Sequence, residues 1–230
     1  MNKLEYWLLK SVVYGRAPLH ILDERNDNDK DNVECWYGSL PPQSTHNEVV
    51  NTFYSLFCKG DLQVQHFDDE WNPVGPLFSP TLQEVKDGLA GKVFLKYGLT
   101  EQGGAKWERV TNPNWSLLLQ ESVTDNIRNF DDVLGDKKGK FLMICATERS
   151  LIDNHVEKNL LQGQIPLKGK MIWSSLVPWE VTYWKTLPSG WRLIYQYYQR
   201  RIKMTAEAFY QQQESSWTRT SWYTIPKLED

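Results

Sequence analysis

The chain has 230 residues, of which 40% are hydrophobic, and its 26 basic and 29 acidic side chains give a formal net charge of −3. This composition excludes disordered, collagen-like and coiled-coil proteins, and the length suits one large globular domain or two small ones. A near-neutral chain has no long-range field that would attract nucleic acid, because such binding depends on Lys and Arg neutralising phosphates.

Residues 1–44 are expected to form an amino-terminal segment that contains an acidic loop. The apolar residues 6–9 are bracketed by Glu5 and Lys10, so the run is too short for the core of a signal peptide. No uncharged stretch approaches the roughly 18–20 residues that a bilayer crossing needs. Residues 23–32 are acidic and asparagine-rich without an apolar residue, which is typical of a solvated loop. We therefore expect a cytoplasmic protein without a membrane partner.

The cysteines also indicate a cytoplasmic protein. Cys35, Cys58 and Cys145 are odd in number and far apart, and each has an apolar neighbour. They show no spacing of a disulfide framework or a metal site. The pattern predicts buried free thiols in a reducing environment.

Residues 45–60 are predicted to form a helix, and a strand is predicted to follow it. Thr45 and Glu48 have the spacing of a capping box, and apolar side chains recur on one face until Gly60. Alternation of apolar and polar residues predicts a strand over 62–66. A turn-rich stretch follows, through residue 76.

A second helix is expected to begin at Ser79 and Pro80, because serine is a good N-cap and proline is favoured at the first helical position. Residues 93–97 are rich in β-forming side chains and predict a strand. Thr100 is placed to cap a further helix that carries Trp107.

The most specific string in the chain, from Tyr97 to Glu108, reads YGLTEQGGAKWE. It resembles the Tyr-x-Leu-Thr-x-x-Gly element of winged-helix regulators of the MarR and PadR kind, in which the last wing strand leads into a helix. The resemblance covers about residues 45–110 and implies a winged-helix-like unit. In such a unit Thr100 would cap the helix, and the glycines would let the turn pack closely against the strand.

Two departures from the winged-helix pattern favour protein contacts over DNA reading. Only residues 90–92 separate the second helix from the following strand, which leaves no room there for a wing hairpin. In that helix the polar groups Gln83 and Lys86 are offset by Glu84 and Asp87, whereas a recognition helix needs an excess of basic groups.

Residues 111–230 are expected to be an aromatic-rich α+β region. Residues 116–120 and 141–146 predict buried strands, and 150–161 a helix. The last sixty residues hold six of the 11 Trp and six of the 11 Tyr. Residues 179–185 and 191–198 read as the two strands of a β-hairpin around a Leu-Pro-Ser-Gly turn. The predicted fold is thus α+β, with a winged-helix-like half followed by a Trp/Tyr-rich antiparallel half. The predicted regions are 1–44, 45–110 and 111–230, with one compact domain formed by the last two as an alternative.

A search for catalytic motifs finds little. The chain has no Gly-x-Ser-x-Gly elbow and no His-Glu-x-x-His, and its histidines are too far apart in sequence for a local metal clip. One group could perform acid–base chemistry, since His66, Asp68 and Glu70 place an imidazole near carboxylates. We expect no cofactor, no metal and no enzymatic activity, with a dispersed acid–base site at these three residues as an alternative.

The aromatic surplus directs the functional prediction. Trp and Tyr near Arg dominate protein-binding hot spots, although they also serve as core residues. We predict a non-catalytic intracellular protein-binding module, for instance an immunity or adaptor protein that masks a partner; a winged-helix DNA-binding regulator is the alternative, although a nucleic-acid partner is not expected. The residues predicted to bind the partner are Trp179, Trp184, Trp191, Tyr195, Tyr198, Arg200 and Arg201.

Overall fold

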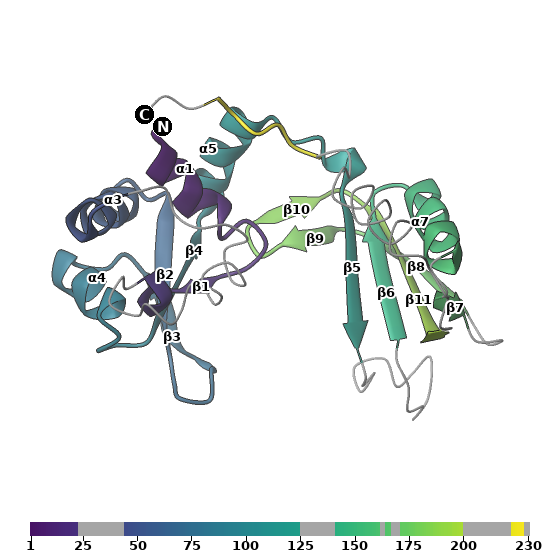
Figure 1. Ribbon diagram of the computed structural model, residues 1–230, viewed down its shortest axis with the longest axis horizontal. Helices are drawn as coiled ribbons and strands as arrows, with labels where there is room; N and C mark the ends of the chain where they lie inside the picture. Colours follow the sequence, from purple (N-terminus) through teal and green to yellow (C-terminus); the bar gives the residue numbers. More distant parts are fainter. Residues whose placement is uncertain (23–43, 125–140, 162–163, 167–170, 200–221, 228–230) are drawn as a thin grey trace, which may run out of the picture. The chain divides into compact units, whose positions relative to one another are not determined.

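The computed structural model describes residues 1–22, 44–124, 141–161, 164–166, 171–199 and 222–227. The fold is α+β with antiparallel sheets, as predicted, and the chain divides into two compact units (Figure 1). Unit 1 comprises Met1–Asn112, Glu180–Thr186 and Ile225–Asp230, and unit 2 comprises Pro113–Trp179 and Leu187–Thr224. The segment Glu180–Thr186 therefore belongs to the first unit, although it lies far away in sequence.

Unit 1 is a four-stranded antiparallel sheet with helices packed on one face. Its elements are α1 (Lys3–Lys10), β1 (Ala17–Pro18), the 3-10 helix η1 (Leu19–Leu22), α3 (His46–Cys58), β2 (Leu62–Phe67), β3 (Pro73–Phe78), α4 (Leu82–Leu89), β4 (Leu95–Leu99) and α5 (Glu101–Thr111). The strand order is β1-β4-β2-β3. Phe53 of α3 meets Tyr97 of β4 edge to face at 4.8 Å, and both side chains are fully buried. This contact fixes the helical layer on the sheet.

Local sequence signals set the helix starts. Capping boxes begin α1 at Asn2, α3 at Thr45 and α4 at Thr81. The prediction at Thr45 is confirmed, and so is the N-cap at Thr100, which accepts the backbone N–H of Gly103. The predicted start at Ser79 is two residues early, because Thr81 has a glutamate three residues later and so completes a capping box.

Strand β3 was not predicted. Its sequence looks like a turn because Pro73, Gly75 and Pro76 interrupt it. It pairs with β2 and forms one edge of the sheet, which is where proline is tolerated within a sheet. Unit 1 thus contains a β2–β3 hairpin before α4, whereas the sequence had indicated only a single strand and a turn.

Unit 2 is a second antiparallel sheet covered on one face by a helix. Its elements are the 3-10 helix η2 (Trp115–Leu117), β5 (Leu119–Thr124), β6 (Phe141–Ala146), α7 (Arg149–Leu161), β7 (Gln164–Pro166), β8 (Ile172–Leu176) and β11 (Gly190–Gln199). The order is β5-β6-β11-β7, and β8 also pairs with β11. Ile152 and Val156 of α7 pack on Leu142, Ile144 and other residues of β6 and β11. The predicted strand at 141–146 and the helix at 150–161 are confirmed. The predicted buried strand at 116–120 is wrong over 116–117, which belong to η2, and residues 119–120 begin the edge strand β5, which is exposed over 121–123.

The predicted hairpin between 179–185 and 191–198 is wrong. β11 pairs with β8, with Ile194 opposite Ile172, and with β6. The strands β9 (Trp179–Thr182) and β10 (Lys185–Leu187) pair with each other instead and place Tyr183 and Trp184 at their tip. The turn signal at 187–190 only joins β10 to β11, because the true partner of β11 lies before the cis Val177–Pro178 bond.

The prediction of buried free thiols is confirmed for one described cysteine and partly wrong for the other. Cys58 and Cys145 are free thiols, as predicted. Cys145 is buried, but Cys58 is exposed because it lies off the apolar stripe of α3. Cys35 and the predicted loop at 23–32 lie outside the described residues. Among the described residues, no helix is long and apolar enough to cross a bilayer.

Candidate partner-binding surface

Most of the residues predicted to bind a partner are either buried or outside the part of the chain that the structure describes. Trp179, Trp184 and Tyr195 are buried, with exposed fractions of 4%, 9% and 1%. Trp191 is 36% exposed. The side chain of Tyr198 and the residues Arg200 and Arg201 lie outside the described part. The set is also divided, since Trp184 belongs to unit 1 and the others to unit 2.

Trp184 is a core residue of unit 1. Its indole N–H donates to the carbonyl of Val13 at 2.8 Å, and its ring meets the Trp107 ring edge to face at 6.3 Å. The indole also lies against α5 at Gly104, where a Cβ would come within 2.0 Å of a ring carbon. The glycine in this part of the YGLTEQGGAKWE string therefore makes room for an aromatic side chain from a distant segment.

Tyr183, the neighbouring tip residue, fastens two backbone segments of unit 1. Its hydroxyl accepts the N–H of Leu99 at 2.6 Å and donates to the carbonyl of Val12 at 2.7 Å. The Arg16 guanidinium lies 5.0 Å from its ring centroid. Burial raises the pKa of the Tyr183 phenol above its ordinary value, so the hydroxyl keeps the proton that it donates.

Among the predicted residues whose side chains the structure describes, Trp191 is accessible. It lies on β11 opposite Ser175, and Trp173 is opposite the next residue but one, so both indoles are on the same face of the sheet. The Arg149 guanidinium lies 4.2 Å from the Trp173 ring centroid. Trp173, which packs against the core of unit 2, and Arg149 were not among the residues predicted to bind a partner.

Two residues of the alternative acid–base site, His66 and Asp68, have structural contacts. The His66 ring stacks on Phe78, with centroids 5.0 Å apart. The Asp68 carboxylate accepts the backbone N–H groups of Glu70 and Asn72, which holds the pKa of Asp68 below its usual value. Asp68 thus closes the turn between β2 and β3. Within the described residues, no group of three or more His, Cys, Asp or Glu side chains is placed to hold a metal.

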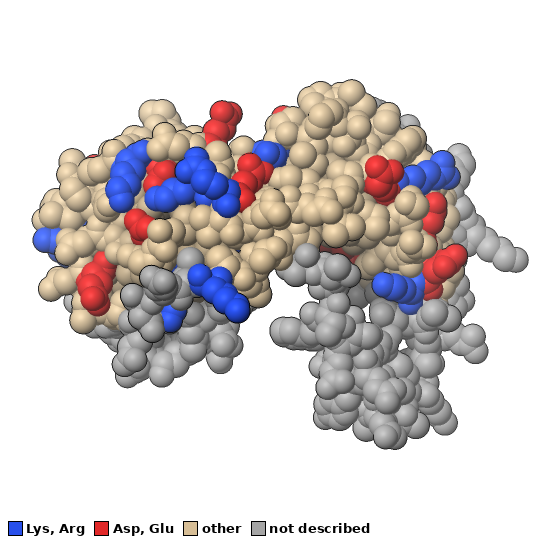
Figure 2. Space-filling model, turned by 90° about the horizontal axis from the view of Figure 1, so that it is seen from above, with Lys and Arg blue, Asp and Glu red and all other residues tan. Residues whose placement is uncertain are grey.

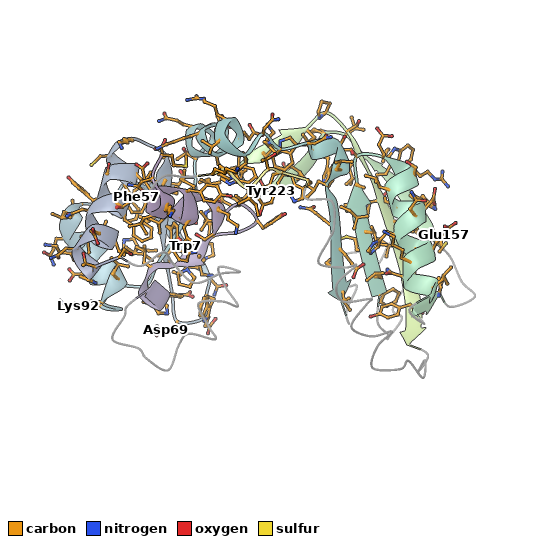
Figure 3. The ribbon with its side chains drawn as sticks, turned by 45° about the horizontal axis from the view of Figure 1, so that its top comes forward. Trp7, Phe57, Asp69, Lys92, Glu157 and Tyr223 are labelled. Carbon is orange, nitrogen blue, oxygen red and sulfur yellow. The ribbon has the colours of Figure 1, made fainter. Side chains whose placement is uncertain are left out.

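That turn carries an exposed tryptophan in an unusual backbone conformation. Trp71 has a φ of 68°, in the left-handed region that glycine and asparagine normally occupy, and it is 45% exposed. Two backbone hydrogen bonds of 3.0 Å hold the turn, from Trp71 to Asp68 and from Asp68 to Asn72. The backbone therefore presents the indole at the end of the hairpin, where Asp69 also lies (Figure 3).

The indole is supported from the adjoining part of the sheet. Phe94 meets it edge to face at 4.7 Å. The Lys96 ammonium lies over both Phe67 and Trp71, at 4.2 and 4.3 Å from the ring centroids, and burial lowers the pKa of Lys96. Aromatic rings stabilise a cation over their faces by about 0.5–2 kcal/mol. The tryptophan is thus held in place rather than loosely attached.

We call this region the hairpin surface. Its members are Phe67, Asp69, Glu70, Trp71, Leu77, Phe94 and Lys96. Leu77 is 39% exposed, whereas Val74 lies opposite His66 and so points to the other face of the hairpin. The sequence pattern indicated acid–base chemistry for His66, Asp68 and Glu70. It did not predict Trp71 as a contact residue, because the strand β3, which makes residues 68–72 a hairpin turn, was not recognised.

Among the described residues that Figure 2 shows, the charged side chains do not form a basic patch of the kind that binds nucleic acid. On the face seen in Figure 2, basic and acidic side chains lie interspersed rather than gathered into one basic field. In α4 the Glu84 carboxylate is held by the Thr81 cap, and Asp87 pairs with Lys92 at 3.1 Å.

Comparison of the chain with protein families, with curated protein sequences and with solved structures found no match.

Proposed function

We propose that this chain is a non-catalytic protein-binding module that contacts its partner through the hairpin surface. The observation that carries the proposal is the exposed Trp71 in the left-handed region. For a residue with a Cβ, that conformation costs about 1–2 kcal/mol. Glycine would remove the strain, so a tryptophan here is best explained by a use for the indole, and tryptophan is among the residue types enriched in binding hot spots.

The edge strand supports recognition by side chains rather than by strand addition. An exposed edge can pair with a strand of another protein through its free backbone groups. In β3, Pro73 and Pro76 lack an N–H, and the register with β2 shifts between Val64 and His66. A partner strand would find an interrupted ladder, whereas the exposed Trp71 and Leu77 are available for side-chain packing.

The winged-helix resemblance is kept as a proposal about packing. Thr100 caps α5, and a Cβ at Gly103 would lie 1.9 Å from the carbonyl oxygen of Asp61. Both features support the close strand-to-helix turn that the resemblance implies. A DNA-binding regulator is the alternative function, and the exposed Lys86 of α4 provides its test.

The experiment compares Trp71→Gly with the wild-type chain. Glycine fits the left-handed backbone, so the variant loses the indole without gaining strain. Val123→Ala, at a side chain 52% exposed in unit 2, is the matched control. Tagged full-length proteins are used for quantitative capture from a native lysate, and at least one protein should be retained by wild type and Val123→Ala but lost with Trp71→Gly.

Two outcomes would contradict the proposal. The first is an identical set of captured proteins for all three chains. The second is salt-sensitive binding of random duplex DNA by the purified chain that is lost in Lys86→Gln, which would favour the regulator because each phosphate contact contributes to the salt dependence.

A further inference from the structure

We infer that the partner presents a basic segment, with an Arg or Lys side chain placed against Trp71 and the carboxylates beside it. This inference rests on the proposed function and names the chemistry of the partner. Its basis is the charge of the hairpin surface and the way in which its one ammonium group is already engaged.

The carboxylates at the tip are available to a partner. Asp68 is committed to the turn through the N–H groups of Glu70 and Asn72. Asp69 and Glu70 are exposed, and no cation among the described residues forms a salt bridge with either. Their carboxylates therefore stand in solvent next to an exposed indole.

The single ammonium at the hairpin surface does not neutralise them. Lys96 lies between the rings of Phe67 and Trp71 rather than against a carboxylate. Three carboxylates and one ammonium give −3 + 1 = −2 for Asp68, Asp69, Glu70 and Lys96. An acidic partner would meet this excess of negative charge, whereas a basic one would relieve it.

An arginine combines the two interactions that this surface offers. Its planar guanidinium can stack on an aromatic ring while its N–H groups bond to carboxylate oxygens. Trp71 provides the ring, and Asp69 and Glu70 provide the oxygens. A lysine would satisfy the charge but would stack less well, so we expect arginine to be preferred.

The test uses the full chain and two synthetic probes: a short arginine-containing peptide and the same peptide with glutamate in place of each arginine. Binding is followed by the amide resonances of residues 68–72 and the indole N–H resonance of Trp71. We expect the arginine peptide to shift these resonances and the glutamate peptide to leave them unchanged. Added salt should weaken the binding, because exposed charges are screened.

Variants separate the charge from the indole. Asp69→Asn with Glu70→Gln should weaken binding of the arginine peptide by about three- to tenfold, the effect of losing two exposed ion pairs. Asp153→Asn with Glu157→Gln is the matched control, since it removes the same charge from exposed positions on α7, where Figure 3 labels Glu157. The control should bind like wild type.

The outcomes that overturn the inference differ from those that overturn the proposed function. Equal binding of both peptides, stronger binding of the glutamate peptide, or resonance shifts that map elsewhere would reject a basic partner. So would a lysate partner that is lost with Trp71→Gly yet bound more tightly by Asp69→Lys with Glu70→Lys. Retention of every lysate partner by Trp71→Gly would instead reject the proposed function itself.

Discussion

Replacing Tyr183 by phenylalanine removes one oxygen and tests whether the tip of the β9–β10 hairpin fastens unit 1. That oxygen bonds the N–H of Leu99 and the carbonyl of Val12, two residues that are fully buried. A buried backbone group left without a partner costs about 1–3 kcal/mol, so two such groups give about 2–6 kcal/mol. Tyr183 is itself 36% exposed. Water can therefore reach part of the site, and we expect the lower part of that range, about 2–4 kcal/mol.

The assay is urea denaturation followed by tryptophan fluorescence, with the free energy of unfolding compared at equal slope. A loss of about 2–4 kcal/mol is a large fraction of the 5–15 kcal/mol typical of a domain, so the transition midpoint should fall clearly. Tyr197→Phe, at a half-buried side chain of β11 in unit 2, is the matched control and should change little. A loss below about 1 kcal/mol in Tyr183→Phe would refute the reasoning, because it would mean that the two backbone groups find other partners.

Three further outcomes follow from the same packing. Gly104→Ala should destabilise by about 1–3 kcal/mol although alanine favours helices, because its Cβ would overlap the Trp184 ring, whereas Gly15→Ala, with open space around it, should not. Cys58 should react quickly with a thiol reagent in the native protein, and Cys145 only on unfolding, because burial raises the pKa of Cys145 to about 11. Lys106→Met should cost about 3–5 kcal/mol in denaturation, because it leaves the Asp61 carboxylate, 4% exposed, without its 2.6 Å ion pair.

The helices could be predicted because their signals are local. A threonine with a glutamate three residues later marked the start of α3, and Thr100 marked that of α5. Such a signal depends on only a few neighbouring residues in the sequence. The one misplaced start, at Ser79, shows that a capping box outweighs a serine followed by proline when both are present.

Strand pairing could not be predicted in the same way, because partners in a sheet are chosen by tertiary contacts. The hydrophobic pattern of residues 179–185 is correct for a strand, yet β9 turns back at Tyr183 because its tip binds Val12, Val13 and Leu99. Nothing near residue 183 in the sequence shows this. The same limit hid the hairpin surface, since β3 is a strand only by virtue of its pairing with β2.

The donation of residues 180–186 to unit 1 leads to a prediction about the isolated fragment 1–112. In that fragment the N–H of Leu99 and the carbonyls of Val12 and Val13 would lose their partners, and the fully buried Trp107 would lose the indole packed beside it. Three lost hydrogen bonds at about 0.5–1.5 kcal/mol each, together with about 3–5 kcal/mol for the lost packing of the Trp184 indole, approach the whole stability of a small domain. We expect fragment 1–112 to lack a cooperative unfolding transition.

A peptide covering residues 179–187 should then restore that transition when it is added to the fragment, because binding to the folded form alone shifts the equilibrium toward it. The same peptide with Trp184→Ala should fail, since it cannot fill the space against Gly104. Circular dichroism with thermal melting measures both. A sharp transition in fragment 1–112 without peptide would contradict this prediction. It would show that the first 112 residues fold alone and that the tip of the β9–β10 hairpin is not needed for the core of unit 1.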